Sequence, residues 1–348
     1  MFEELLREWD GEQAVVRFDR PSGAWMFICI HSTRLGPAGG GTRMRVYPSP
    51  SDGLHDGMRL AAGMTRKMAV LGVPFGGGKA VLAVPELPNG EARRALLLRY
   101  GDLVSSLGGT FRTAADMNTT AADVDVIGER SRYVYGRSAE HGGGGDSGVG
   151  TARGVFHGIR ASLLNAYRSD DLAGRSVLVQ GVGSVGGHLA RNLAEEGAEL
   201  ILTDVADERA AELAAELGAR VVAPERALET ECDVYAPCAV GGTLDRETIP
   251  QLRCRIVAGS ANNQLAEAED AEHLRAAGIL YAPDYVINAG GVLQLMGIED
   301  LGWDAATLEE NLAGIGTTLG EIYAAAAAEG ITTAEAAERL AAARLSAA

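Results

Sequence analysis

The stretch that decides the fold is Ser176-Val-Leu-Val-Gln180, followed at once by Gly181-Val182-Gly183-Ser184-Val185-Gly186. The first five residues have the apolar, β-branched composition of a buried strand. Leu189 and Leu193 continue at helical spacing from Val185, which predicts an amphipathic helix that ends near Gly197. A G-x-G-x-x-G pattern between a strand and a helix allows a tight turn and brings a pyrophosphate to the helix N-terminus. The stretch therefore predicts a dinucleotide-binding loop.

Asp204 strengthens this prediction because it closes the next predicted strand, about 20 residues after the glycines. A carboxylate at that position accepts hydrogen bonds from the hydroxyls of the adenine ribose. It also repels the additional phosphate of NADP, and the first arginine that follows it is Arg209. We therefore expect NAD as the cofactor.

Short apolar runs alternate with alanine-rich helical stretches from Ser176 onward. Strands that alternate with helices indicate parallel βαβ units, so we expect a Rossmann domain. The last helix is expected to begin at Thr332, which forms a capping-box pattern with Glu335, after Gly330 has ended the helix before it. The predicted strands are 176–180, 200–203, 221–222, 233–235, 255–258 and 279–282.

The first half of the chain has a different pattern and predicts a separate α/β domain. Strand candidates are 14–18, 25–30 and 80–84, and helical stretches are 52–64 and 92–107. The glycine-dense segment 141–148 is the candidate hinge. We expect an α/β fold of two domains with a deep cleft between them: residues 1–137, on which the final helix 331–348 packs back, and the NAD-binding residues 138–330.

Two lysines in the first half point to a small anionic substrate. Lys79 follows three glycines at 76–78, and a second lysine, Lys67, precedes them in the sequence. We expect Lys79 on a glycine-rich loop, where a cation is costly unless it meets an anion or exchanges protons. The stretch is not a phosphate-binding P-loop, because Val73 stands where the pattern needs glycine and Ala80 where it needs Ser or Thr.

Composition excludes several classes of function. The chain has 348 residues, a net charge of −16 and 47% hydrophobic residues, and it shows no basic stripe, so we expect neither nucleic-acid nor membrane binding. The four cysteines form no CxxC pair and no zinc-ligand spacing, which predicts no metal site and reduced thiols in the cytosol. The acidic start of the chain lacks the pattern of a signal peptide, so we expect a cytoplasmic protein.

Seven further segments lie in order along nearly the whole chain: Gly36-Pro-Ala-Gly-Gly40-Gly-Thr-Arg43, Gly63-Met-Thr-Arg-Lys67, Gly76-Gly-Gly-Lys79, Thr113-Ala-Ala-Asp116, Tyr235-Ala-Pro-Cys238-Ala, Gly259-Ser-Ala-Asn262-Asn263 and Tyr281-Ala-Pro-Asp284-Tyr-Val-Ile-Asn288-Ala-Gly-Gly291. Together they resemble the glutamate/leucine/phenylalanine/valine dehydrogenase family. The resemblance implies reversible, NAD-dependent oxidative deamination of an L-amino acid to its 2-oxo acid and ammonium. It also implies a homo-oligomer built through the first domain.

The resemblance assigns roles to individual positions. Lys67 matches the lysine that holds the substrate carboxylate, Lys79 the catalytic lysine, and Asp116 the acid that handles protons at the amino group. Two lysines close together should lower each other's pKa, which would give Lys79 a neutral fraction as a base. From the residues alone, Asp116 could also be a helix cap or turn acid, and Asn262 could be a turn residue. On the cofactor side, the matching positions are Ser147, Thr151, Cys238, Ala239 and Asn262, with Asn262 also able to reach the substrate.

The positions that match the substrate pocket are apolar. They contain no lysine or arginine to pair a second carboxylate, and an unpaired buried carboxylate costs several kcal/mol, so glutamate is a poor substrate. Gly39 and the segment 301–303 favour phenylalanine, toward which we lean, whereas Ala114 and Val292 are typical of the leucine enzymes, and leucine or valine is the alternative. A non-catalytic NAD- or amino-acid-sensing module is the rival from another class, disfavoured by the intact Lys67, Lys79 and Asp116. The substrate positions are Gly39, Gly40, Met64, Ala114, Asn262, Val292 and Leu295.

Overall fold

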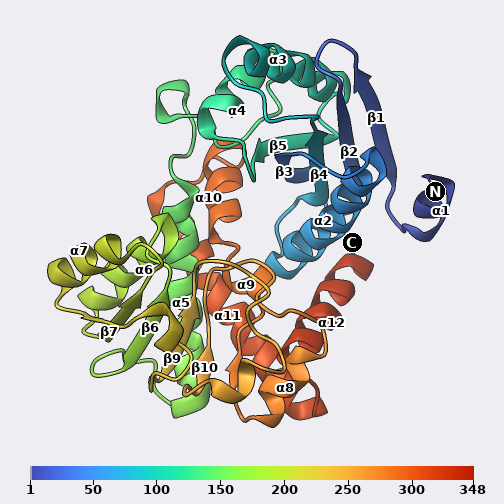
Figure 1. Ribbon diagram of the computed structural model, residues 1–348. Coiled ribbons are helices and arrows are strands. Elements are labelled where there is room, and N and C mark those ends of the chain that lie inside the picture. The colour runs from blue at the N-terminus through green and yellow to red at the C-terminus, as the bar shows by residue number, and fades with distance from the viewer. Residues whose placement is uncertain (1) are drawn as a thin grey trace. The chain divides into compact units, whose positions relative to one another are not determined.

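The computed structural model describes residues 2–348 and divides into two compact units (Figure 1). The first unit runs to Gly145 and also contains Ala341–Ala348, and the second spans Asp146–Leu340. The boundary therefore falls inside the glycine-dense segment. Each unit is built around a β-sheet flanked by helices, which confirms the α/β class predicted from the sequence.

The sheet of the first unit mixes antiparallel and parallel pairs. Its strand order is β1-β2-β4-β3-β5, with β1, β2 and β4 antiparallel and β4, β3 and β5 parallel. Helix α2 packs on one face, and α3 and α4 lie on the other (Figure 1). The elements are α1 Phe2–Glu8, β1 Gln13–Asp19, β2 Ala24–Ser32, β3 Ala38–Arg45, α2 Pro50–Leu71, β4 Gly76–Ala83, α3 Gly90–Ser106, β5 Phe111–Ala115, α4 Ala121–Gly128 and η1 Ala139–His141.

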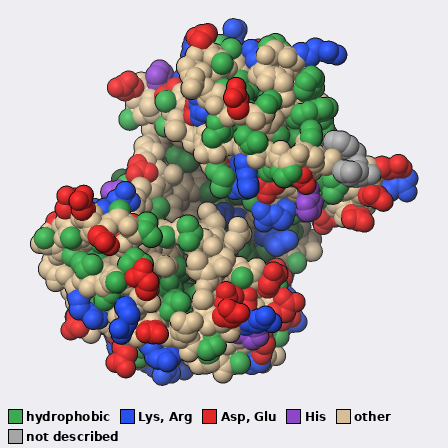
Figure 2. Space-filling model, in the orientation of Figure 1, with side chains coloured by type: hydrophobic (Ala, Val, Ile, Leu, Met, Phe, Trp, Pro, Cys, Tyr) green, Lys and Arg blue, Asp and Glu red, His purple; other side chains and the backbone are tan. Residues whose placement is uncertain are grey.

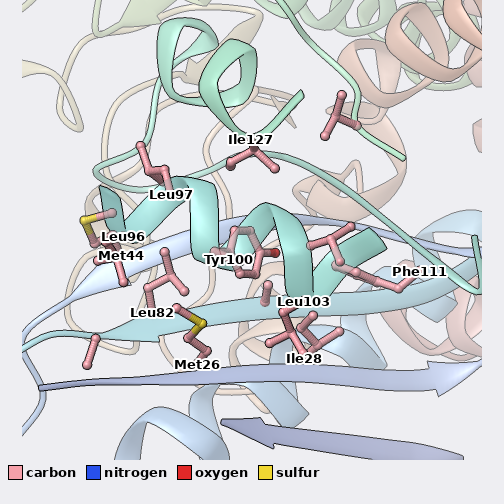
Figure 3. Close-up of a cluster of buried hydrophobic side chains, with 14 of the residues drawn as sticks. Met26, Ile28, Met44, Leu82, Leu96, Leu97, Tyr100, Leu103, Phe111 and Ile127 are labelled. Carbon is pink, nitrogen blue, oxygen red and sulfur yellow. The ribbon is translucent and has the colours of Figure 1, made fainter. Parts of the chain in front are cut away.

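Alternation along β4 gives this sheet a core on each face. Ala80 and Leu82 join the cluster under α3, which Figure 3 shows with Tyr100 and Leu103 packed over Met26 and Ile28 of β2. Residues at the alternate positions of β4 and β2, such as Val81 and Phe27, join the smaller cluster under α2. Because successive side chains of a strand point to opposite faces, Lys79 faces α2.

The glycines before Lys79 form part of strand β4, so the prediction that Lys79 lies on a glycine-rich loop is wrong. Strand β4 begins at Gly76, whereas the sequence predicted it only from residue 80. A Cβ on Gly40 of β3 would lie 1.8 Å from the carbonyl oxygen of Gly78. A Cβ on Gly77 would lie 2.1 Å from the amide nitrogen of Thr65 on α2. The glycines thus let β3, β4 and α2 approach closely. The sequence analysis missed β3, because its three glycines weaken the strand signal, and it also missed β5.

The second unit is a doubly wound parallel sheet. Its strand order is β11-β10-β9-β6-β7-β8, so the order reverses between β6 and β9, as in dinucleotide-binding folds. The elements are α5 Ser147–Tyr167, β6 Ser176–Gln180, α6 Ser184–Glu195, β7 Glu199–Thr203, α7 Asp207–Leu217, β8 Arg220–Val221, η2 Pro224–Arg226, β9 Val234–Pro237, η3 Ile249–Gln251, β10 Ile256–Val257, α8 Asp270–Ala276, β11 Leu280–Tyr281, α9 Asp284–Ile287, α10 Gly290–Glu299, α11 Ala305–Glu329 and α12 Thr333–Ser346, of which the part from Ala341 onward belongs to the first unit.

The predicted helix ends of this unit are confirmed. Gly197 follows α6 and Gly330 follows α11, both with a left-handed backbone at φ 78° and 69° that favours glycine. At the start of α12, the Glu335 amide donates a 3.1 Å hydrogen bond to the Thr332 hydroxyl. The local sequence therefore determines where these helices begin and end.

Acidic and basic side chains both spread over the face of the molecule in view (Figure 2). Within residues 2–348, no helix combines the length and the apolar composition needed to span a membrane.

The close packing of α2 on β4 can be tested at Gly77. We expect Gly77→Ala to cost about 1–3 kcal/mol, because its methyl group would push the Thr65 backbone away, and to lower the midpoint of thermal unfolding by several degrees. Calorimetry measures this shift. Gly63→Ala is the matched control, because its Cβ would meet no atom within 4 Å and alanine favours helix, so its midpoint should hold or rise. Equal midpoints for the two variants would contradict the packing.

Candidate active site

Lys79 is buried and paired with Asp116. Lys79 is 6% exposed, and its Nζ lies 3.1 Å from Oδ1 of Asp116. Lys79 comes from β4, and Asp116 directly follows β5, two strands away in the same sheet. A Cβ on Gly41 of β3, the strand between them, would lie 2.8 Å from the Asp116 Cβ, so glycine there leaves room for the pair. The structure thus brings together the two predicted catalytic residues.

A tight turn holds Asp116 in place. Its amide donates a 2.8 Å hydrogen bond to the Thr119 hydroxyl, which in turn donates to the Thr42 carbonyl of β3 at 2.7 Å. Asn118 adopts a left-handed backbone at φ 60°, and its side-chain amide donates to the Met44 carbonyl at 3.0 Å. Asp116 is therefore fixed to β3 by its own turn and is not a helix cap, since the cap of α4 is Thr120.

Sequence reasoning assigned no role to Arg43 and Asp56, which extend the pair into a network. The Arg43 Nε donates to Oδ2 of Asp116 at 2.9 Å, and one of its terminal nitrogens donates to Oδ2 of Asp56 at 3.0 Å. Asp56, on α2, also accepts a 2.7 Å hydrogen bond from the Tyr47 hydroxyl. The only available signal was the presence of Arg43 at the end of the glycine-rich segment 36–43.

The network sets the charges of the pair. Burial is the largest influence on Lys79 and lowers the pKa of its ammonium group, opposed by attraction to Asp116 and assisted by repulsion from Arg43. Burial alone would raise the pKa of Asp116, but Lys79 and Arg43 together hold it below its ordinary value. The largest influence on Lys79 is therefore its burial, and Arg43, to which sequence reasoning assigned no role, is a cation that lowers its pKa.

The other predicted substrate residues of the first unit surround the same region. Lys67 and Met64 lie on α2 and are half-buried, and α2 contacts β4 where Thr65 meets Gly77. On β3, Gly39 pairs with Gly77 of β4 and with Arg112 of β5. Gly40 of β3 pairs with Thr113 of β5, and Gly41 pairs with Ala114, the remaining predicted substrate position of this unit.

The predicted dinucleotide loop has the shape that a pyrophosphate requires. Gly181 has a left-handed backbone at φ 88°, and a Cβ on Gly186 would lie 1.9 Å from the Gly181 carbonyl oxygen. A Cβ on Gly183 would meet no atom within 4 Å, so this glycine borders open space at the N-terminus of α6. Asp204 accepts a 2.8 Å hydrogen bond from the Val182 amide and a 2.9 Å bond from the Ala206 amide, which fixes its carboxylate beside the loop. Ser184 and Val185 begin α6.

Cys238 and Ala239 close the other side of the loop. They follow β9, the strand beside β6 where the sheet order reverses, and a Cβ on Gly181 would lie 2.7 Å from that of Ala239. Burial raises the pKa of the Cys238 thiol, and this fits a packed thiol better than a nucleophile. Asn262 is exposed, and its side-chain oxygen accepts a 2.8 Å hydrogen bond from Asn288.

Ser147 and Thr151 pack against α10. The Thr151 hydroxyl donates to the Ser147 carbonyl at 2.9 Å, and a Cβ on Gly291 would lie 2.5 Å from that hydroxyl. Val292 and Leu295, the predicted pocket residues of this unit, are half-buried on the same helix. Asp146 caps α5 through the Gly148 amide at 2.8 Å and accepts a 2.9 Å hydrogen bond from Ser184, which joins α5 to the loop.

Among residues 2–348, no group of three or more His, Cys, Asp or Glu side chains is arranged to hold a metal ion.

Two comparisons with protein families cover most of the chain. Residues 16–133 match the Glu/Leu/Phe/Val dehydrogenase dimerisation domain, and residues 202–348 match glutamate/leucine/phenylalanine/valine dehydrogenase. The chain belongs to this family. As a member of the glutamate/leucine/phenylalanine/valine dehydrogenases it is an amino acid dehydrogenase, and the resemblance predicted from the sequence is confirmed.

Individual members of this dehydrogenase family are similar over nearly the full length. Leucine dehydrogenase of Geobacillus stearothermophilus is 42% identical over 98% of this chain and 92% of its own. Valine dehydrogenase of Streptomyces virginiae is 45% identical over 96% of this chain and 94% of its own. The crystal structure of L-tryptophan dehydrogenase from Nostoc punctiforme superposes with a TM-score of 0.88 at 39% identity, covering 99% of this chain and 98% of that one.

Two glycines of the loop should separate folding from dinucleotide binding. Gly186→Ala forces the Gly181 carbonyl to move, so it should lower the thermal unfolding midpoint of the cofactor-free protein. Gly183→Ala has room for its methyl group and should leave that midpoint unchanged, while weakening NADH binding about tenfold or more, because the methyl group occupies the space of the pyrophosphate. NADH fluorescence titration measures the affinity. Wild-type affinity in Gly183→Ala would show that the dinucleotide binds elsewhere.

Proposed function

We propose that this chain catalyses the reversible, NAD-dependent oxidative deamination of a branched-chain L-amino acid to its 2-oxo acid and ammonium. The observation that carries the proposal is the buried Lys79–Asp116 pair, with Nζ and Oδ1 3.1 Å apart, on the sheet face covered by the helix that bears Lys67. A buried lysine with a lowered pKa beside an ionised carboxylate is typical of proton chemistry in an active site.

The use of lysine in the chain supports this role. Lys67 and Lys79 are the only lysines in 348 residues, and every other member of the 31 Lys and Arg residues is an arginine. Arginine keeps its proton in proteins, whereas a buried lysine can lose it. A chain that otherwise uses arginine for its cations thus has lysine where the proposal requires a group that titrates.

Each polar group has a defined task in the proposal. The Lys67 ammonium pairs with the substrate carboxylate. Asp116 is ionised and accepts a proton from the substrate amino group. Lys79, in its neutral form, takes a proton from the water that adds to the imine carbon, and its ammonium form then stabilises the oxygen that develops negative charge.

The loop of the second unit fits NAD. Its open space at Gly183 and the N–H groups at the start of α6 would hold the pyrophosphate, and the fixed carboxylate of Asp204 would hold the adenine ribose and disfavour NADP. Bound NAD would supply the hydride acceptor for the substrate Cα–H bond. Residues proposed to line the rest of this site are Ser147, Thr151, Cys238, Ala239 and Asn262.

The relatives support branched-chain substrates better than the phenylalanine toward which the sequence leaned. The curated relatives described above are named leucine and valine dehydrogenases. The proposed pocket positions Gly39, Met64 and Ala114, with Val292 and Leu295, carry no charge, which is consistent with an aliphatic side chain and not with glutamate.

We also propose a cytosolic homo-oligomer. The matched description of residues 16–133 as a dimerisation domain supports assembly through the first unit. All four cysteines are unpaired thiols, as expected in a reducing compartment.

A substrate panel tests the proposal. NADH formation at alkaline pH with L-leucine, L-valine, L-isoleucine, L-phenylalanine, L-tryptophan and L-glutamate should give the largest kcat/KM with a branched-chain substrate, and NADP should replace NAD poorly. Larger kcat/KM for phenylalanine or tryptophan would contradict the substrate class. No turnover of any substrate by protein that binds NADH would favour a sensing module.

Lys79→Ala tests the assigned base. We expect loss of turnover by about a thousandfold or more, because the proton acceptor and the cation are removed together. NADH affinity should stay within a few-fold of wild type, since the dinucleotide loop belongs to the second unit. Near-normal turnover in this variant would refute the role of Lys79.

A further inference from the structure

Arg43 lies between two carboxylates in a row of alternating charges. Its guanidinium donates to Oδ2 of Asp116 at 2.9 Å and to Oδ2 of Asp56 at 3.0 Å, while Oδ1 of Asp116 faces the Lys79 ammonium at 3.1 Å. The Arg43 side chain is 15% exposed and that of Asp56 13%. The row Lys79–Asp116–Arg43–Asp56 is thus largely shielded from water, and contacts between charges are stronger in such a place than in bulk water.

The row is anchored from four parts of the fold. Lys79 comes from β4, Arg43 from β3, Asp116 from the turn after β5, and Asp56 from α2. At its far end, Asp56 is held by Tyr47 and by Arg59, whose terminal nitrogen lies 3.0 Å from Oδ1 of Asp56. If Arg43 turned away from Asp116, two half-buried carboxylates would lose part of their pairing.

We propose that Arg43 is a positioning residue that keeps Asp116 ionised before each turnover, ready to accept the substrate proton, and so leaves Lys79 as the group whose protonation sets the pH dependence of kcat/KM. The inference deepens the proposed function and rests on it. A guanidinium on Oδ2 favours the anionic form of Asp116 before the substrate proton arrives, because arginine does not surrender its own proton. Oδ1 alone remains for Lys79 and the substrate.

The sign of the effect on Lys79 follows from the charges around it. The ionisable groups that face Lys79 are Asp116, Arg43 and Asp56, together with Cys29 on β2, whose thiol is neutral because burial raises its pKa to about 12. Asp56 and Lys67 both lie on α2. Removing the Arg43 charge removes a repulsion on the Lys79 ammonium and leaves two carboxylates near it. Lys79 then holds its proton more tightly.

The experiment is the pH profile of kcat/KM for oxidation of L-leucine by NAD in wild type and three variants. Arg43→Gln should move the ascending limb about 1 pH unit higher, with about tenfold lower kcat/KM on the limb and recovery at higher pH. Arg43→Lys keeps the positive charge but lacks the forked guanidinium that bridges the two carboxylates. The ascending limb of its kcat/KM profile should therefore stay at the wild-type pH, while the plateau value of kcat/KM falls several-fold. Arg59→Gln, which contacts Asp56 but not Asp116, is the matched control and should keep the wild-type limb.

The outcomes separate the possible failures. An unmoved limb in an active Arg43→Gln variant, with kcat/KM reduced equally at every pH, would indicate a merely structural role and overturn the inference. If Arg43→Gln does not fold, Arg43→Lys decides alone: a lower plateau on the wild-type limb supports the bridge, and an unchanged plateau overturns it. No turnover by wild type with L-leucine or any substrate of the panel contradicts the proposed function, and the inference falls with it.

Discussion

A lysine ammonium buried against an ionised aspartate is the interaction on which the rest of the first unit depends. Water would favour the charged form of Lys79, but the sheet and α2 exclude water from this side chain. The charge is therefore stabilised by Asp116, whose Oδ1 lies 3.1 Å from the Lys79 Nζ. The contact requires three neighbouring strands and a helix to approach more closely than ordinary side chains allow. Glycines at positions such as Gly41 and Gly77 provide that approach, because a Cβ there would meet Asp116 or Thr65 at less than 3 Å.

The second unit uses glycine for a related purpose. Gly181 and Gly186 fold the loop back on itself, where a side chain at Gly186 would meet the Gly181 carbonyl oxygen at 1.9 Å. A Cβ on Gly183, by contrast, would meet no atom within 4 Å, which leaves open space at the N-terminus of α6. In both units, glycines allow close backbone packing beside the candidate site residues, which include Lys79 in the first unit and Asp204 in the second.

Sequence reasoning succeeded where structure is encoded locally. The strand 176–180, the glycine loop and the ends of α6 and α11 follow from neighbouring residues, and the structure confirms them. It failed for β3 and for the start of β4, because a strand made of glycines carries no periodic signal and is stabilised only by its partners in the sheet. The role of Arg43 was missed for a similar reason: 73 residues separate it from Asp116 in the chain, and only the sheet order brings them together.

The most direct test of the account is the protonation of Lys79 in the cofactor-free protein. Because the chain has only two lysines, protein labelled with ¹³C at lysine gives two side-chain signals, and Lys67→Arg leaves the signal of Lys79 alone. We expect the Cε resonance of Lys79 to titrate at a lower pH than that of free lysine in the same buffer, since burial outweighs its attraction to Asp116. Titration at or above the pH of free lysine would contradict the claim that a desolvated, readily deprotonated lysine lies at the centre of this site.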